Sequence, residues 1–496
     1  MSETFVEHEG GDVLSAALSV TNTVKNADGF DELSAAIAQR YAEREEFERA
    51  VEIADTINDP YTLEKTLADI AVKCASVGDE DYAFELIESL EDLSHQATAM
   101  TRISIAHAAR GEFDRATQIA SGMEDNSNLL AEIAALSAAQ GDFERALSIA
   151  QTIDFPLSRA LALTRIAEGY VKAGHGPRAA RLLSQALEET LDIETDDERA
   201  TARAEIALRL ADAGDAEQCA TVLAQALEDA EIAEEPYRDT ALAQLAASHA
   251  RLKQYDVALE VTEKINDVYV AAETLANLAV VEREAGDREA DALQLLNDAH
   301  ELLRDEEPTE QKQEAQRWNV LTLVAVRYAE FGAEAQALKA TESIGPAEEK
   351  ARALFGIAQR AIEAGNAEAA LRAANTIDGV NYRISALFRI SRHLLTADAA
   401  NEHGLKTLAD AVRLIEEVER PVERAVELAE AAALYALAGR KEQSAKLLHE
   451  ALTESSSVSG EYEKASALVM ISDAYAKSGH EPDEQAREML WQITAV

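Results

Sequence analysis

The feature of this sequence that most constrains its fold is a two-residue motif that recurs along almost the whole chain. Its second member is always Ala or Ser, and its first is usually a large aliphatic residue. A Leu or Met three residues earlier usually completes an apolar stripe, because positions i, i+3 and i+4 share one face of a helix. The motif occurs about thirteen times, as Ile37-Ala38, Ile70-Ala71, Ile103-Ser104, Ile133-Ala134, Ile166-Ala167, Ile206-Ala207, Leu245-Ala246, Leu278-Ala279, Val324-Ala325, Ile357-Ala358, Ile390-Ser391, Ala431-Ala432 and Ile471-Ser472.

A turn signal follows the small residue at a fixed distance of seven positions. It is usually Gly, which tolerates the left-handed conformation that ends many helices. Two copies, at 111–116 and 141–146, read Gly-Glu-Phe-Asp-Arg-Ala and Gly-Asp-Phe-Glu-Arg-Ala. Each unit is therefore predicted to be two helices joined by a tight turn, with the small residue allowing the second helix to approach closely. A single hairpin cannot bury its apolar face, so neighbouring hairpins must stack.

This pattern resembles the tetratricopeptide (TPR) repeat over roughly residues 30 to 496. The unit that begins at Arg159 matches it well, with Leu163, Ile166, Ala167, Tyr170, Gly174, Ala179, Ala186 and Leu187 at the family positions, although the family Trp is never present. The resemblance implies an all-α fold, an α-α superhelix (solenoid) of about thirteen TPR-like helical hairpins. A HEAT or armadillo-type solenoid is the alternative. We expect residues 1–30 to form an N-terminal capping segment with a helix over Asp12 to Val24, residues 31–482 to form the array, and residues 483–496 to form a C-terminal capping helix.

Charge is the second strong signal. The chain has 93 acidic and 46 basic residues, a formal net charge of -47, and Arg outnumbers Lys. Self-repulsion of this size destabilises a compact protein unless molar salt screens it over about 3 Å. The composition therefore favours a protein of a salt-in halophile over one with a surface built for a basic partner, because the acidic residues are spread along the chain. It also predicts no nucleic-acid partner, since no basic stripe is present.

The sequence contains no signal of catalysis, export or membrane insertion. Phosphate-loop, dinucleotide, nucleophile-elbow and zinc-protease motifs are absent, and no two His have ligand spacing, so we expect no enzyme, metal or cofactor. Cys74 and Cys219 are predicted to be buried, reduced side chains. The acidic first residues do not resemble a signal peptide, and no apolar run is long enough to span a bilayer. A cytoplasmic location is expected.

A basic residue recurs at the start of the first helix, fifteen residues before the turn. Two roles are open. It can pair with carboxylates and helix-ending carbonyls of the preceding turn, which is often acidic, or it can form a ladder of cations for an acidic ligand. The structural role is favoured. The residues are Arg159, Arg199, Arg238, Arg317, Lys350, Arg383, Arg424 and Lys464.

The resemblance also implies where a partner binds. TPR proteins hold ligands against the inner face formed by their first helices, and the matching positions here are mostly small and apolar. The predicted groove residues are Leu161, Thr164, Leu208, Ala243, Arg352, Phe355, Val426 and Ala429, with Ala204 and Ala247 at further matching positions. Such a groove suits an amphipathic helix or an extended peptide. The same residues can instead pack only on one another in a tightly wound array.

Two functions follow. The first is a non-catalytic protein–protein interaction scaffold that binds a helical or extended peptide in the inner groove. The second is a structural protein that self-associates through this groove or through the terminal helix with Trp491. The expected partner is thus a protein or peptide, with a homo-oligomer as the alternative.

Overall fold

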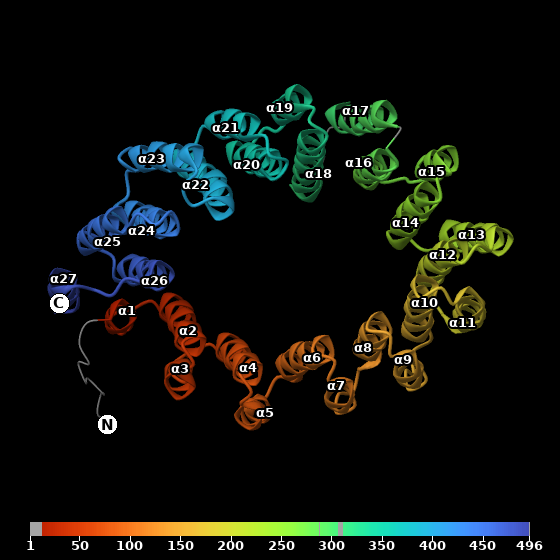
Figure 1. Cartoon of the computed structure of the whole chain (residues 1–496), viewed down its shortest axis with the longest axis horizontal. Coiled ribbons are helices and arrows are strands. Elements are labelled where there is room, and N and C mark those ends of the chain that lie inside the picture. The colour runs from red at the N-terminus through yellow and green to blue at the C-terminus, as the bar shows by residue number, and fades with distance from the viewer. Residues whose placement is uncertain (1–11, 287, 306–310, 496) are drawn as a thin grey trace. The chain divides into compact units, whose positions relative to one another are not determined.

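The computed structural model describes residues 12–286, 288–305 and 311–495, and every regular element in these ranges is helical. The all-α prediction is confirmed. The first part of the expected N-terminal capping segment lies outside the described residues. The helices divide into two compact units, which are described separately (Figure 1).

Unit 1 comprises residues 1–96 and 346–496, and thus contains both ends of the chain. Its helices are α1 (Val13–Thr21), α2 (Ala27–Glu43), α3 (Phe47–Ala54), α4 (Pro60–Ser76), α5 (Glu80–Ser89), α20 (Ala347–Glu363), α21 (Ala367–Asn375), α22 (Val380–Ala397), α23 (Glu402–Ile415), α24 (Pro421–Leu437), α25 (Lys441–Ser456), α26 (Glu461–Ser478) and α27 (Glu484–Thr494).

Unit 2 comprises residues 97–345, so α6 (Leu93–Ala109) begins just before it. Its other helices are α7 (Phe113–Ala120), α8 (Ser127–Ala139), α9 (Phe143–Ala150), α10 (Pro156–Lys172), α11 (Gly176–Glu189), the short 3-10 helix η1 (Thr190–Asp192), α12 (Asp196–Asp212), α13 (Ala216–Ile232), α14 (Tyr237–Arg251), α15 (Tyr255–Thr262), α16 (Val268–Glu284), α17 (Glu289–Asp305), α18 (Gln311–Glu330) and α19 (Glu334–Glu342).

Helices pair into TPR-like hairpins, as predicted, with an even-numbered first helix and an odd-numbered second helix from α2/α3 to α24/α25. Every residue of the recurring two-residue motif is buried. At two of the three Ser positions the hydroxyl contacts the second helix: Ser104 Oγ donates to the carbonyl of Ala116 at 2.9 Å, and Ser391 Oγ to that of Gly404 at 2.9 Å. The side chain at this position must be small because backbone of the second helix lies directly against it.

The turn position usually has a left-handed backbone, as the glycine pattern predicts. Ten glycines have positive φ in the described residues, from +66° at Gly479 to +99° at Gly78. Three units lack glycine there: Glu45 (φ 66°) and Lys253 (φ 61°) take the same conformation, whereas Asp398 after α22 is extended (φ -151°). The repeat therefore tolerates a strained residue at this turn more readily than a large one at the Ala/Ser position.

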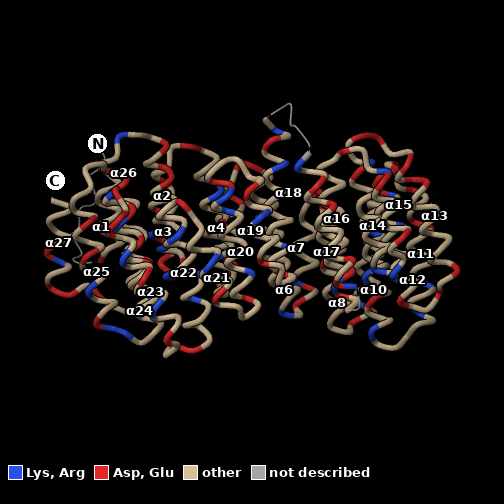
Figure 2. The backbone as a smooth tube through the Cα atoms, turned by 90° about the horizontal axis from the view of Figure 1, so that it is seen from above, with Lys and Arg blue, Asp and Glu red and all other residues tan. Residues whose placement is uncertain are grey.

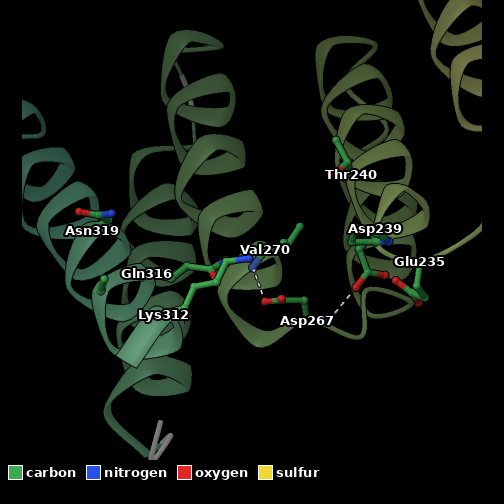
Figure 3. A pocket seen from close by; sticks show the side chains of 10 residues that line it. Glu235, Asp239, Thr240, Asp267, Val270, Lys312, Gln316 and Asn319 are labelled. Atoms are coloured by element: carbon green, nitrogen blue, oxygen red, sulfur yellow. Dashed lines mark hydrogen bonds between the residues drawn. The ribbon is translucent and has the colours of Figure 1, made fainter. Parts of the chain in front are cut away.

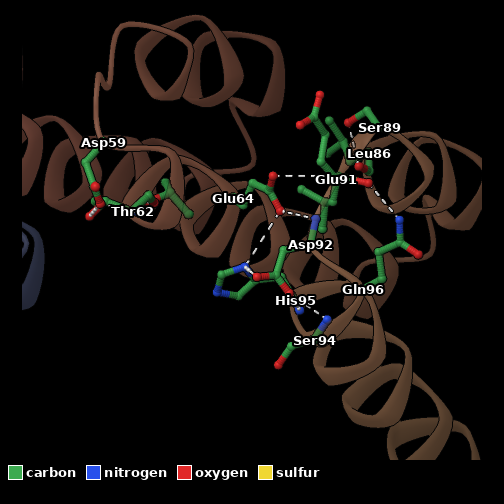
Figure 4. A network of polar contacts seen from close by, with 12 residues as sticks. Asp59, Thr62, Glu64, Leu86, Ser89, Glu91, Asp92, Ser94, His95 and Gln96 are labelled. Carbon is green, nitrogen blue, oxygen red and sulfur yellow. Dashed lines mark hydrogen bonds and ion pairs between the residues drawn. The ribbon is translucent and has the colours of Figure 1, made fainter.

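A carboxylate near the start of several first helices ties one hairpin to the next. Asp31 accepts the backbone N–H groups of Asn58 and Asp59, both at 2.9 Å, in the turn that leads to α4. Glu64 does the same for two backbone N–H groups before α6, and Figure 4 shows it pointing into that turn together with His95. Asp239 repeats the arrangement before α16. These side chains satisfy backbone donors that the helices leave unpaired.

Replacement of Asp31 tests this tie. Asp31 is buried, so Asp31→Ala leaves two backbone donors without an acceptor and should reduce the free energy of unfolding by about 2–4 kcal/mol. The measurement is thermal or urea unfolding followed by circular dichroism. Asp55→Ala, at an exposed site in the same region, is the control and should change stability by less than about 0.5 kcal/mol. Equal effects of the two changes would contradict this account.

Both ends of the chain meet within unit 1. Helix α1 contacts α2, as expected of a cap on the first hairpin, but it packs more closely on α26 (Figure 1). Helix α27 packs on α25 and α1 and buries Ala486, Leu490 and Ile493, while Trp491 is 63% exposed. In the other hairpins the second helix packs beside the first helix. Beside α26, helix α1 occupies that position.

One glutamate in unit 1 makes stability depend on pH. Burial, with the charge of Glu423 added, raises the pKa of Glu427 on α24 to about 7. The folded state then binds more protons than the unfolded state from about pH 4.5 to 7, so this group lowers stability as pH rises through that range.

We therefore expect Glu427→Gln to stabilise the protein at pH 8 by up to about 3 kcal/mol and to have little effect at pH 4. Thermal melts of the variant and the parent at the two pH values provide the measurement. The control is Glu416→Gln, at an exposed position. A stabilisation independent of pH, or one shared by the control, would show that Glu427 is not held protonated.

Candidate functional site

Most of the recurring basic residues have a structural role. Five arginines donate from the guanidinium to a carbonyl in the turn before their own helix or, for Arg317, in the last turn of the preceding helix, at 2.6–3.0 Å. They thereby satisfy acceptors that a helix end leaves unpaired. The acceptors of Arg159, Arg199, Arg317, Arg383 and Arg424 are the carbonyls of Ile153, Ile193, Leu303, Ile377 and Val418.

Three of these arginines also form an ion pair inside their own hairpin. The carboxylate comes from the second helix, thirty residues later. The preceding acidic residues also contribute, as the sequence suggested, because Arg199 pairs with Asp196 and Arg238 lies 3.7 Å from Glu235. The hydrogen bond that Arg159 donates to Glu189 raises the pKa of Arg159. The three pairs are Arg159–Glu189 at 2.5 Å, Arg199–Asp229 at 3.0 Å and Arg424–Glu454 at 2.7 Å.

The predicted groove residues divide between the two units and between core and surface. Leu161, Thr164, Leu208 and Ala243 belong to unit 2, whereas Arg352, Phe355, Val426 and Ala429 belong to unit 1. The fully or nearly fully buried ones offer no surface to a partner; they are Thr164, Leu208 and Ala429. Their positions face a neighbouring hairpin, and the Thr164 hydroxyl donates to the carbonyl of Ala160 inside α10 at 2.7 Å.

The remaining predicted residues reach the surface to different extents. Ala243 is half-buried against the core of unit 2. Leu161, Phe355 and Val426 are half-buried. Arg352 is exposed and lies 3.3 Å from Glu349 on the same helix. Leu161 lines a cavity in unit 2.

That cavity, which we call the arginine hollow, lies on the first helices α10, α12 and α14 of unit 2. Its volume is about 390 Å³. Leu161 forms an apolar wall with Ala204 and Ala247, two further residues of the predicted groove. Two of its lining residues are arginines, and the full lining is Leu161, Arg165, Thr201, Ala204, Glu205, Gln244, Ala247, Ser248 and Arg251.

Some arginines near the arginine hollow form ion pairs and others do not. Arg209, whose partner Glu205 lines the hollow, forms ion pairs with Glu205 at 2.8 Å, Asp212 at 3.0 Å and Glu168 at 3.3 Å. Arg165 and Arg251 are exposed, and neither forms an ion pair with a carboxylate in the described ranges.

Glu168, whose pKa the charge of Arg165 helps to lower, already interacts with other basic side chains. A hydrogen bond from Lys172 lowers the pKa of Glu168, and the charges of Arg209 and Arg165 add to that effect. Glu168 is therefore ionised at neutral pH and is shared among several cations. Arg165 and Arg251 therefore line one hollow as two cations without an ion pair in the described ranges, in a chain with twice as many acidic as basic residues.

Sequence reasoning did not single out Arg165 or Arg251. Arg165 lies four residues after Leu161 in α10, so helical spacing alone puts both on one face. Arg251 is the last residue of α14. Arg165 stands directly before the Ile166-Ala167 motif, a position that Arg102 and Arg389 also occupy in their units.

A second cavity of about 550 Å³, the acidic hollow, lies at the amino ends of α14, α16 and α18. Figure 3 shows the side chains of α14 and α18 on opposite sides of it, with Asp267 between them. Its buried or helix-starting carboxylates are already bonded. Asp239 accepts the backbone N–H of Asp267 at 2.7 Å, and Asp267 accepts those of Tyr269 and Val270. These acids cap helices, so the acidic hollow holds fewer groups for a ligand than its composition suggests.

No groups of three or more His, Cys, Asp or Glu are placed to hold a metal ion anywhere in the described ranges. Both cysteines are buried thiols, as predicted, and burial raises the pKa of Cys74 to about 11. Among the described helices, none combines the length and apolarity that crossing a bilayer requires. Acidic side chains are distributed over all parts of the chain, as Figure 2 shows.

Comparisons with known proteins return structural matches only. No family model and no curated protein sequence matches the chain. Ton1535 from Thermococcus onnurineus NA1 is 18% identical, with 71% of this chain and 97% of that chain covered and a TM-score of 0.24. A circular tandem repeat protein with novel repeat topology is 17% identical over 97% and 93% of the chains, with a TM-score of 0.17. A human IFIT1 dimer with m7Gppp-AAAA is 15% identical over 89% and 93%, with a TM-score of 0.25.

With identities and TM-scores this low, the matches contribute nothing to the interpretation of the two hollows. They do correct one prediction. The acidic composition was taken to exclude a nucleic-acid partner, but the IFIT1 structure contains m7Gppp-AAAA. The exclusion was wrong because overall charge does not describe a local pocket, and the arginine hollow is such a local exception in this chain.

Replacing an arginine at a helix start and replacing an arginine of the hollow should change the free energy of unfolding by different amounts. Arg159→Ala removes hydrogen bonds to two carbonyls and to Glu189, so it should lower the free energy of unfolding by about 1–3 kcal/mol. Arg165→Ala removes no ion pair and should change stability by less than about 0.5 kcal/mol. Urea unfolding of both variants provides the measurement. A loss on Arg165→Ala as large as that on Arg159→Ala would show that Arg165 supports the fold.

Proposed function

We propose that this protein is a non-catalytic interaction scaffold whose arginine hollow binds a polypeptide segment with an acidic group beside small apolar side chains. The observation that supports this most strongly is the pair Arg165 and Arg251, which line the hollow without an ion pair. A carboxylate on the partner would supply the charge that the chain itself does not place there, through charge-assisted hydrogen bonds.

The wall of the hollow favours a peptide. Leu161 and Ala247 offer apolar surface, while Thr201 and Gln244 offer polar groups for a backbone or a side chain. Its volume of about 390 Å³ is near the lower end of ligand-site volumes and suits one or two side chains. Aromatic side chains, on which nucleic-acid bases stack, do not line this hollow.

The spacing of the helices sets the length of segment that can bind. Neighbouring packed helices are about 8–10 Å apart, so three of them span about 20 Å. An extended peptide of about six residues covers that length, as does a helix of about four turns. The partner therefore contacts α10, α12 and α14 together, and contacts on either side of the hollow supply the rest of the affinity.

Salt determines how the partner is recognised. In molar KCl, charges interact only over about 3 Å, so long-range attraction or repulsion is largely absent. Direct contact with the two guanidinium groups and burial against Leu161 then determine affinity. Such a site works in the medium that the net charge of -47 favours.

Peptide display tests the proposal. Random dodecamer peptides are selected on the full chain in molar KCl, and enriched sequences are synthesised and measured by fluorescence anisotropy. We expect Asp or Glu next to Ala or Leu in the enriched set. Affinity should fall by about tenfold or more on Arg165→Glu and on Arg251→Glu, equivalent to about 1.4 kcal/mol each.

The matched control is Arg181→Glu, the same charge change at an exposed site on the second helix α11. Peptides that bind the Arg165→Glu and Arg181→Glu variants equally would refute the assignment of the site. A single-stranded oligonucleotide that binds and displaces the peptides would instead identify nucleic acid as the ligand of the hollow.

A further inference from the structure

The last hairpin of the array is assembled from the two ends of the chain. Helix α26 follows the pattern of a first helix, with Ile471 and Ser472 buried, but the helix that follows it, α27, packs on α25 and α1. In place of a following second helix, α1 from the other end of the sequence packs along α26. The hairpin is therefore complete only when the amino-terminal helix is docked.

The α1 side of this junction is almost wholly apolar. Val13, Leu14, Ala17 and Val20 are at most 5% exposed, although α1 has only nine residues. An isolated helix of nine residues is unstable in water, so α1 is helical because it is docked. The opposing α26 buries Leu468, Ile471 and Tyr475. This contact has the character of the helix-in-groove complexes that separate proteins form.

The α2 side of the junction is polar and specific. Arg40 on α2 makes a two-pronged contact with Asp473 on α26, through Nε to Oδ1 at 3.1 Å and Nη2 to Oδ2 at 2.9 Å. Tyr462 donates its hydroxyl to Glu32 at 2.8 Å. Arg44 donates to the Ser472 hydroxyl at 3.2 Å. A bidentate pair fixes the orientation of the two partners as well as attracting them.

We propose that this junction is an exchangeable interface, in which α1 and α2 of one copy of the chain dock on α26 and α27 of a second copy. Every copy carries both complementary surfaces, and the contacts that join them are non-covalent. Exchange of such an element is a low-cost route to a dimer, since all contacts of the monomer are re-formed. The interface lies in unit 1 and is independent of the arginine hollow in unit 2.

The short link between α1 and α2 means that both helices must be exchanged together. Residues 22–26 join α1 to α2, and a link of five residues spans at most about 17 Å. Helix α1 can therefore reach a second copy only if its own α2 lies beside that copy's α26. Repulsion between two strongly acidic chains opposes the dimer at low salt, so molar KCl and high protein concentration should favour it.

A charge swap distinguishes exchange from a permanent internal contact. Arg40→Asp places two carboxylates against each other within its own junction, and Asp473→Arg places two guanidinium groups there. When the two variants are mixed, every junction between one copy of each restores an Asp–Arg pair. The double variant restores the pair within a single chain and serves as the control for folding.

The measurement is molar mass by light scattering after size exclusion, at moderate salt so that charge still discriminates. We expect each single variant alone and the double variant to elute mainly as monomer, and the mixture to give twice the monomer mass. The double variant should also recover the melting temperature that each single variant loses. A mixture that stays monomeric would overturn the proposal, as would a double variant that recovers no stability.

Discussion

The contact on which the rest of the structure depends is the close approach of the two helices in each hairpin at a single small residue. Ala167 is fully buried, and at equivalent positions Ser104 and Ser391 donate to carbonyls of the second-helix backbone, so a larger side chain there would separate the pair. At the third Ser position, the Ser472 hydroxyl instead accepts a hydrogen bond from Arg44. Stacking, the turn geometry and the position of both hollows all follow from this fixed spacing.

Charged side chains join neighbouring hairpins to one another. Carboxylates such as Asp31 and arginines such as Arg159 satisfy the backbone groups that the helix ends leave unpaired, so much of the polar composition is used to join hairpins. The same use of charge makes the exceptions informative. Arg165 and Arg251 form no such ion pair, and they line one cavity. The junction of α1 with α26 differs in kind, since it is mainly apolar and joins surfaces that every copy of the chain carries.

The fold could be predicted from the sequence because its determinants are local and periodic. Ile166, Ala167 and Gly174 each have a role set by neighbours within one hairpin, and repetition reveals it. The candidate site could be predicted only in part. Leu161 lines the hollow, but Thr164 and Leu208 are buried, because a one-position difference on a helix decides whether a side chain faces solvent or the next hairpin. The docking of α1 on α26 has no local signal and depends on contacts between the two ends of the chain.

The central claim is that the arginine hollow binds the acidic segment of a partner. A crystal structure of the full chain with a display-selected peptide tests it most directly. The account predicts a peptide carboxylate within hydrogen-bond distance of the Arg165 and Arg251 guanidinium groups, with an apolar side chain against Leu161. A peptide bound on the second helices, with both guanidinium groups left in solvent, would contradict it.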